Sequence, residues 1–393
     1  MKILKVEIEG SPLFKDRVDI DFVARQRVDD DDKEVLYYIF SNIYLNKVIS
    51  FIGINASGKT TILKAISFVF NMLNNESINN IKSNEIFKDM SDNQKAIITS
   101  YFYKNKLVYK LETIIKKEVN NLDGSERFII LEEFLWSKDI RKIKTKKGIF
   151  EFKDSDLAIE RNQKEQYLMD DISIIIAVNK IRNDVRSFYV RDLLNWTNRN
   201  TLHVMGNYPK ELLIFLDPRI EYLKCEIDDK FRVDYFRLKF YDKEEIIISD
   251  EKMLEKYLSS GTIKGLGVFM SAFFAFCEGG YMIIDEIENH FNKEIVATLI
   301  RFFMDSRVNK NGATLIFSTH YSELLDEFSR NDGIYITRNK GGITACNLAD
   351  VLKRNDLKKS EVYDSDYLGG TVPLYDAYMA LKNTLISMMG RLR

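Results

Sequence analysis

The feature that most constrains this chain is an eight-residue segment, Gly53–Thr60, which matches the pattern G-x-x-x-x-G-K-[ST] at every position. Residues 48–52 before it are apolar and β-rich, which predicts a buried parallel strand, and the residues from Thr61 onward are apolar at helical spacing. Strand, glycine-rich loop and helix together form a cradle for phosphate, because backbone N–H groups turn inward and the helix N-terminus adds partial positive charge. The alternative is a chance glycine-rich turn before a helix, which would not need the complete match.

This loop predicts a distinct role for each kind of residue in it. The glycines let the backbone curl around the phosphates. Lys59 would reach the β- and γ-phosphates of ATP, and the hydroxyl of Thr60 would hold Mg²⁺. The residues that we expect to bind nucleotide in this segment are Gly53, Asn55, Ala56, Ser57, Gly58, Lys59, Thr60 and Thr61.

Two later strands end in polar residues that suit the same chemistry. The apolar residues 281–284 lead into Asp285 and Glu286. Asp285 would hold Mg²⁺, and Glu286 would orient or deprotonate the attacking water. The apolar residues 313–317 are followed within three positions by His320, which could donate a hydrogen bond to the γ-phosphate or to the water. Taken singly, the acidic pair could be a solvated turn and the histidine a structural residue; their order after the phosphate loop favours the functional interpretation.

A second possible anion site precedes the strongly apolar segment 263–277. Ser259 is a good helix N-cap residue, and Gly261 is small enough to leave backbone N–H groups open at the helix start. A plain helix cap would have the same sequence, so this signal depends on its neighbours. The apolar run itself is too short to span a bilayer, and we expect a buried helix.

Composition excludes several classes of protein. The chain has 393 residues, 45% of them hydrophobic and 30% charged, and a formal net charge of −1, which is typical of a globular protein of two or three domains. This balance argues against a dominant nucleic-acid surface, although the basic run 137–147 could bind a nucleic-acid backbone or an acidic partner instead of being a solvated face. Three widely separated cysteines and the absence of a signal-like start predict a reducing, cytoplasmic location without membrane contact.

The expected elements divide the chain into three segments. Residues 1–90 would form an N-terminal ATPase lobe, 91–250 an inserted subdomain of strands and then helices, and 251–393 a C-terminal ATPase lobe. Alternation predicts strands at 1–9, 18–22, 35–40, 96–103, 107–115, 128–136, 231–241 and 245–248. Apolar spacing predicts helices at 158–191, 193–200 and 210–216.

In this order the motifs resemble the head of an ABC-type ATPase. Such a head is an α/β P-loop NTPase with a mixed sheet flanked by helices, here with an inserted lid. The matching segments are Walker A at 53–60, the signature at 258–262, Walker B at 282–286, the D-loop at 287–292 and the switch histidine at 320. More narrowly, the chain resembles ATPases related to the overcoming-lysogenization-defect (OLD) proteins of abortive-infection and other anti-phage systems. That likeness is carried by 14–16, 20–22, 259–262, 284–289 and 366–373.

The resemblance implies a homodimer, or a higher homo-oligomer, that sandwiches ATP and Mg²⁺ between two heads. Ser259 and Gly261 of one subunit would then cap the γ-phosphate bound to Lys59 of the other. OLD nucleases carry a metal-dependent TOPRIM domain after the ATPase, and the residues after His320 are too few for it, so we expect a separate toxin or nuclease as partner. No glutamine is clearly placed for the Q-loop, Gln94 being a poor candidate, and no aromatic residue is clearly placed to stack on adenine.

Two classes of function remain open at this point. The first is an ATPase that senses infection and controls a separate effector. The second is a DNA-repair or chromosome-maintenance ATPase of the SMC, RecF or Rad50 type; the lack of a long heptad pattern counts against SMC and Rad50 but not against a RecF-like clamp. A transporter subunit has less support because the long insertion is atypical.

Overall fold

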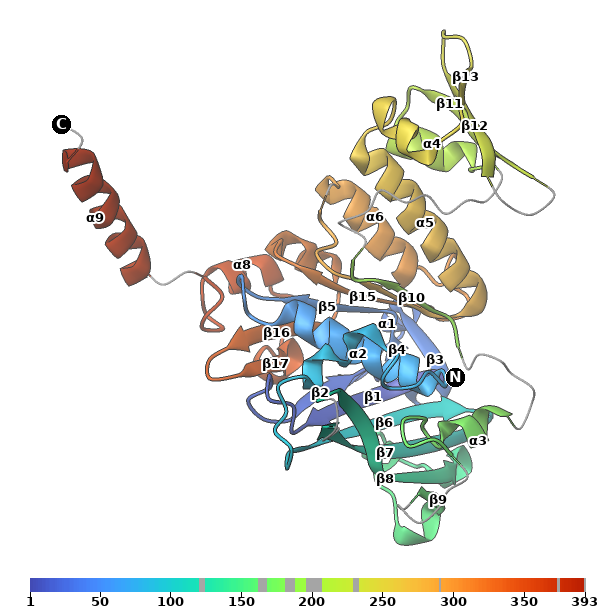
Figure 1. The fold of residues 1–393 in the computed structure, drawn as a ribbon, viewed down its shortest axis with the longest axis vertical. Coiled ribbons are helices and arrows are strands. Elements are labelled where there is room, and N and C mark those ends of the chain that lie inside the picture. The colour runs from blue at the N-terminus through green and yellow to red at the C-terminus, as the bar shows by residue number, and fades with distance from the viewer. Residues whose placement is uncertain are drawn as a thin grey trace.

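The computed structural model describes residues 1–119, 124–161, 168–180, 188–195, 207–228, 233–289, 291–372 and 375–391. Its body consists of two six-stranded sheets with helix α2 (Lys59–Leu73) between them (Figure 1). Most of the expected helix at 193–200 and residue 290 of the expected D-loop lie outside the described residues. The arrangement confirms the predicted α/β fold.

One sheet carries the strand that leads into the phosphate loop. Its order is β10-β14-β15-β5-β16-β17, and its first five strands are mutually parallel, while β17 is antiparallel to β16. The central strands are buried along their whole length, which explains their continuous apolar sequences. The bounds are β10 Val190–Leu193, β14 Tyr281–Ile284, β15 Thr314–Thr319, β5 Val48–Ile52, β16 Ile334–Asn339 and β17 Ile343–Asn347.

The other large sheet is antiparallel throughout, in the order β2-β1-β6-β7-β8-β9. Buried and partly exposed residues alternate along β7, so one face of the sheet packs on the core that includes α2. Between β2 and β5 in the sequence, β3 (Leu36–Phe40) and β4 (Ile43–Asn46) form a separate two-stranded hairpin. The bounds of the large sheet are β2 Val18–Asp21, β1 Lys2–Glu9, β6 Lys95–Lys104, β7 Leu107–Val119, β8 Glu126–Asp139 and β9 Leu157–Arg161.

The opposite face of the parallel sheet is covered by α5 (Ser260–Glu278) and α6 (Lys293–Met304), which share a second apolar core with it. Among the described helices, α5 is long and apolar enough to cross a membrane, but 61% of its most apolar stretch is buried inside the protein, as in a core helix. The shorter helices are α1 Asp32–Val35, α3 Ile175–Lys180, α4 Lys210–Leu216, α7 Leu348–Val351 and α8 Lys359–Asp364, and the chain's last helix is α9 Tyr375–Arg391. The 3₁₀ turns among the described residues are η1 Lys82–Phe87, η2 Ile140–Lys142, η3 Lys147–Ile149, η4 Asp154–Asp156, η6 Glu251–Lys256 and η7 Ser322–Glu327.

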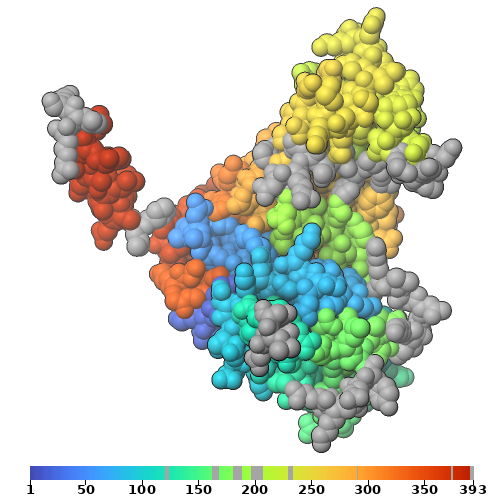
Figure 2. Space-filling model, viewed as in Figure 1, coloured from blue at the N-terminus to red at the C-terminus, as the bar shows by residue number. Residues whose placement is uncertain are grey.

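A separate lobe rises from the start of α5 (Figures 1 and 2). It consists of α4 and the three-stranded sheet β11 (Ile220–Ile227), β12 (Val233–Phe240) and β13 (Ile246–Ile248). A third apolar core joins this lobe to the first half of α5. The start of α5 is therefore held by the lobe, whereas its later turns pack on the parallel sheet.

The structure corrects the expected helix at 158–191. Residues 157–161 are strand β9 and residues 190–193 are strand β10, and of the expected helix only α3 is helical among the described residues. β10 is extended because it pairs in parallel with β14 along its whole length, and this tertiary pairing outweighs the local helical spacing. Val35, expected in a strand, is the last residue of α1. The boundary expected at residue 90 stays a prediction; the strands on its two sides share one sheet.

Candidate nucleotide site

The loop after β5 has the backbone shape that its sequence requires. Ala56 and Gly58 have positive φ angles of 60° and 94°, which turns successive N–H groups toward one side. A Cβ atom on Gly58 would lie 2.5 Å from the side chain of Ile343, and one on Gly53 would lie 2.4 Å from the hydroxyl of Thr337. Glycine is therefore needed at both positions for close approach, and at Gly58 for its left-handed conformation as well. α2 begins directly after the loop, at Lys59.

Lys59 is buried at the base of this loop. Its Nζ donates hydrogen bonds to the carbonyl oxygens of Gly53, at 2.9 Å, and Ile54, at 3.3 Å, and lies 3.4 Å from Nδ1 of His320. Burial lowers the pKa of Lys59, while the carboxylate of Glu288 is the strongest of the charges that oppose this effect. The ammonium is thus held by backbone carbonyl groups of the loop, next to the N-terminus of α2, where it could bind an anionic phosphate.

Thr60 and Asp285 bring the loop and the end of β14 together. The Thr60 hydroxyl donates to Oδ2 of Asp285 at 2.7 Å, and the hydroxyl of Ser318 at the end of β15 donates to Oδ1. No cluster of three histidine, cysteine or carboxylate side chains forms a self-sufficient metal site in the described part of the chain. The hydroxyl and carboxylate oxygens here are the ligand type that Mg²⁺ prefers, and phosphate and water would complete its shell. The residues present therefore fit a magnesium-bound nucleotide.

Glu286 has a strained backbone at the edge of the same sheet. Its φ angle is 47°, in the left-handed region that non-glycine residues seldom adopt. Its backbone N–H donates to the Ser318 hydroxyl at 2.7 Å, and its Oε2 accepts from the Asn289 amide at 2.6 Å. Its Oε1 lies 3.9 Å from Nε2 of His320. These contacts hold the carboxylate beside the Lys59 site, where it can receive a proton.

His320 is positioned through Glu288, a residue that the sequence did not single out. The His320 backbone N–H donates to Oε1 of Glu288 at 2.6 Å. The other carboxylate oxygen of Glu288 is buried and has no hydrogen-bond partner among the described residues. Burial, and then the charge of Lys59, lower the pKa of His320, so the neutral imidazole is favoured. A neutral imidazole can both donate and accept a hydrogen bond.

Strand β16 supports the loop through two side chains that the sequence reasoning also missed. Thr337 contacts Ser57, with 2.7 Å between their hydroxyl oxygens, and donates to the Ile52 carbonyl at 3.2 Å. Asn339 donates to the carbonyl of Ala56 at 3.3 Å. A short polar residue on a buried strand was a visible signal for Thr337, but its partner could not be known without the pairing of β16 with β5.

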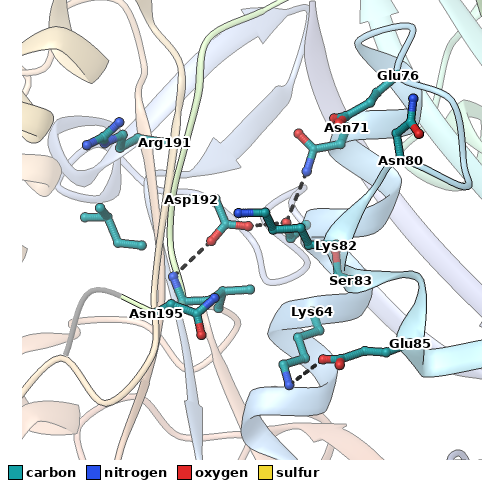
Figure 3. Close-up of a pocket in the computed structure, with 13 residues that line it drawn as sticks. Lys64, Asn71, Glu76, Asn80, Lys82, Ser83, Glu85, Arg191, Asp192 and Asn195 are labelled. Atoms are coloured by element: carbon teal, nitrogen blue, oxygen red, sulfur yellow. Dashed lines mark hydrogen bonds and ion pairs between the residues drawn. The ribbon is translucent and has the colours of Figure 1, made fainter. Parts of the chain in front are cut away.

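β10 places further polar residues beside α2, at a pocket whose lining does not include the phosphate loop. This pocket of about 470 Å³ lies between α2, η1 and the end of β10. Figure 3 shows Lys64, Asp192 and Asn195 among the residues that line it. Oδ2 of Asp192 accepts a hydrogen bond from Ser67 of α2, and Lys64 pairs with Glu85 at 2.7 Å. Gln94, the weak Q-loop candidate, instead donates to the Gly10 carbonyl at the edge of the antiparallel sheet.

The predicted signature residues are not brought to this site within one chain. Ser259 caps α5, and its hydroxyl accepts a hydrogen bond from the Thr262 N–H at 3.0 Å. Gly261 lies in the first turn of the same helix. Among the described residues, no hydrogen bond joins either of them to Lys59. Asn55 and Thr61 lie in the phosphate loop and the first turn of α2, as expected.

Two comparisons with known proteins agree with this geometry. The family model described as "AAA domain, putative AbiEii toxin, Type IV TA system" matches residues 48–326, from β5 into η7. The phosphonates import ATP-binding protein PhnC of Mesoplasma florum is 33% identical over 107 residues, which are 26% of this chain and 39% of that protein. The chain thus covers well under half of that relative's length. The narrower resemblance to OLD-related ATPases stays a prediction.

Proposed function

This chain belongs to the family described as "AAA domain, putative AbiEii toxin, Type IV TA system", and we propose that it is an ATP-hydrolysing, ABC-like ATPase that dimerises around ATP and Mg²⁺. In this proposal, closing and opening of the dimer control a separate toxin or nuclease in an anti-phage system. The protein would work as the nucleotide-dependent regulator, and the partner would carry the damaging activity.

One observation carries the ATPase part of the proposal. Side chains separated by more than two hundred residues meet at one edge of the parallel sheet: Thr60 bonds Asp285 at 2.7 Å, and Lys59 lies 3.4 Å from His320. Ligands of parallel α/β sheets bind at the carboxyl ends of the strands, where these residues lie. Bound Mg²⁺ would neutralise charge on the phosphates.

The remaining residues of the site have roles that follow from their positions. Lys59 and the N–H groups of the loop would bind the phosphates. Glu286 would accept the proton of the attacking water, and Asn289 would keep its carboxylate in place. His320, held by Glu288, would hydrogen-bond the γ-phosphate or the water and keep it in line.

The dimer is proposed because the expected signature residues do not lie at the Lys59 site of their own chain. Ser259 and Gly261 lie at the start of α5, which packs on the lobe. Backbone N–H groups at a helix start suit an anion such as the γ-phosphate, but no hydrogen bond in the described part of the chain joins them to the Lys59 of the same chain. A second copy, related by two-fold symmetry, would bring its helix start to the Lys59 site and receive the same in return.

A role in a toxin–antitoxin system is supported by the description of the family, which calls the matching domain a putative AbiEii toxin; the separate effector is proposed from the resemblance to OLD-related ATPases alone. The DNA-repair alternative has less support from the surface that suggested it. Within the basic run 137–147, Lys138 donates to the carbonyl groups of Gly148 and Glu151, and Lys146 donates to those of Ala24 and Gln26. Two of its charges are therefore used inside the fold.

Phosphate release from ATP, measured with and without Mg²⁺, tests the enzymatic part. The wild type should release phosphate only with Mg²⁺, and Asp285→Asn should be inactive. The matched control is Asp192→Asn, the same change at the end of the neighbouring strand, which should keep most of the activity. A wild type that releases no phosphate, or an Asp285→Asn variant as active as the wild type, would contradict the proposal.

Isolation of the native complex tests the regulatory part. The protein carrying Glu286→Gln, purified from its own cells in the presence of ATP, should retain a toxin or nuclease that Lys59→Ala does not retain. Phage plaque counts should rise in cells with Lys59→Ala. An unchanged plaque count in those cells would argue against a defence role.

A further inference from the structure

The C-terminal helix α9 has a large apolar face without cover. Figures 1 and 2 show that it stands away from the body of the protein. Of the side chains from 375 to 389, all are exposed except that of Met379, which is half-buried. Seven large apolar side chains are each more than half exposed: Tyr375 72%, Tyr378 56%, Leu381 60%, Leu385 53%, Ile386 61%, Met388 57% and Met389 67%.

These apolar residues form a single stripe. Tyr378, Leu381, Leu385 and Met388 follow one another at intervals of three and four, which places them on one side of a helix. The other side carries short polar groups, among them Asn383, Thr384 and Ser387. A single helix of this length is marginal in water unless its apolar face packs on something. The sequence therefore specifies a partner surface for α9.

The segment that leads to α9 is fixed to the nucleotide site. On one side, Asp364 of α8 accepts from Ser322 at 3.0 Å and Ser360 donates to Asp326 at 2.6 Å, so α8 is tied to η7, which begins two residues after His320. On the other side, Arg338 of β16 donates to the Gly369 carbonyl at 2.7 Å.

β16 contacts both this segment and the phosphate loop. Thr337 and Asn339, on either side of Arg338, bond Ser57 and Ala56 of the loop. Successive residues of a strand point to opposite faces. The side chains of Thr337 and Asn339 therefore bond the phosphate loop, while the side chain of Arg338 between them bonds the carbonyl groups of residues 368 and 369. Residues 368–369, a few positions before α9, are therefore tied to the part of the molecule that would bind the triphosphate.

Exposed apolar side chains also occur in the lobe that holds the other half of the proposed composite site. Ile247 of β13 is 67% exposed, and Met253 and Tyr257, at 38% and 40%, come just before Ser259. In the proposed dimer, the start of α5 of one copy faces the phosphate loop of the other. The residues that precede it would then come to the side of the partner molecule from which α9 extends.

We propose that the apolar face of α9 packs on a second copy of this chain, against the surface formed by Ile247, Met253 and Tyr257. This inference rests on the proposed ATP-dependent dimer and adds a second, protein-only contact to it. Because residues 368–369, which precede α9, and the phosphate loop bond to the same strand, ATP binding and helix docking would reinforce each other. The contact would make dimerisation stronger than a nucleotide bridge alone.

The experiment measures the dimer dissociation constant by sedimentation in ATP and Mg²⁺, with Glu286→Gln as the parent so that ATP persists. Adding Leu381→Asp and Leu385→Asp should raise that constant roughly tenfold or more, because two buried leucines are lost from the contact. The matched control adds Asn383→Asp and Ser387→Asp, which place the same charges on the polar side of α9, and should leave the constant unchanged. Met253→Asp with Tyr257→Asp should weaken the dimer like the leucine changes.

The outcomes separate this inference from the proposed function. Equal dissociation constants for the parent and the leucine variant would overturn the role of α9 and leave the ATP dimer standing. Weakening by the leucine changes but not by the changes at Met253 and Tyr257 would overturn the assigned surface. A parent that stays monomeric in ATP would overturn both. ATP affinity of the leucine variant, measured by equilibrium dialysis on the monomer, should match the parent and shows that the variant is folded.

Discussion

The phosphate loop and the start of α5 differ in how much of their surroundings their own chain provides. Around the loop, Lys59 lies 3.4 Å from His320, and the neighbouring Thr60 donates a hydrogen bond to Asp285. At the start of α5, the Ser259 hydroxyl bonds Thr262 in its own first turn. The residues expected in the first half of the site thus meet within the single chain, whereas those expected in the second half would meet them only in the proposed dimer.

This difference teaches which parts of the site can be tested in a monomer. Changes around the loop should impair nucleotide chemistry in every copy that carries them. Changes at the start of α5 should spare the copy's own loop and impair the site of its partner. Each prediction below strengthens or removes this distinction.

The largest effect is expected for Glu286→Gln. The substitution keeps the size of the side chain and its hydrogen bond with Asn289 but removes the proton acceptor, so turnover should fall about 1,000-fold. ATP affinity should remain near that of the wild type, because Glu286 is not a phosphate ligand. Single-turnover phosphate release and equilibrium dialysis measure the two quantities. Turnover at the wild-type rate would show that another group is the base.

Lys59→Ala should weaken ATP binding about 100-fold, since a charge-assisted contact to phosphate is worth ~3 kcal/mol. Lys64→Ala is the matched control: it lies on the same helix and its ion pair with Glu85 is at the surface, where such pairs contribute little. Titration calorimetry measures the ATP dissociation constant of both variants, and only that of Lys59→Ala should rise. Equal affinities would remove the phosphate role of the loop.

Mixing variants tests the shared site. Ser259→Arg alone and Lys59→Ala alone should both be inactive as homodimers, the first because a bulky cation blocks closure. An equal mixture should recover about a quarter of wild-type turnover, because half of the dimers are mixed and each then has one intact site. Phosphate release from the mixture is the measurement. If no activity returned, the Lys59 loop and the Ser259 helix start would not form a site shared between two chains in the way proposed.

The site was predictable where its chemistry followed local pattern. Asp285 and His320 each follow an apolar strand, and parallel strands bring their carboxyl ends to one edge, so their meeting with Lys59 required no knowledge of distant contacts. The supporting residues were not predictable in this way. Thr337 acts through the pairing of β16 with β5, and Glu288 acts through a loop whose path depends on Ser318.

The fold shows the same limit at β10. Its four residues carry too little alternation to indicate a strand, and the neighbouring apolar residues at helical spacing favoured a helix. Only the register with β14, from Val190 opposite Tyr281 to Leu193 opposite Ile284, makes it extended. By contrast β6 and β7 were predicted because a short turn joins them and their alternation is long. Sequence pattern suffices for local pairing and fails for an edge strand paired across the chain.

The smallest effect is expected from a change of pH, and it concerns only His320 and the phosphate-loop half of the site. The pKa of His320 is below its ordinary value near 6.5, because the imidazole is partly buried and close to Lys59. Below that ordinary value the unfolded chain binds a proton that the folded chain resists, so His320 stabilises the fold less as pH falls toward its folded pKa. His320→Gln should therefore make the loss of stability between about pH 7 and about pH 5 shallower than in the wild type. Urea unfolding midpoints across that range measure it, and parallel slopes for the two proteins would show that the imidazole is not held beside the Lys59 ammonium in the free protein.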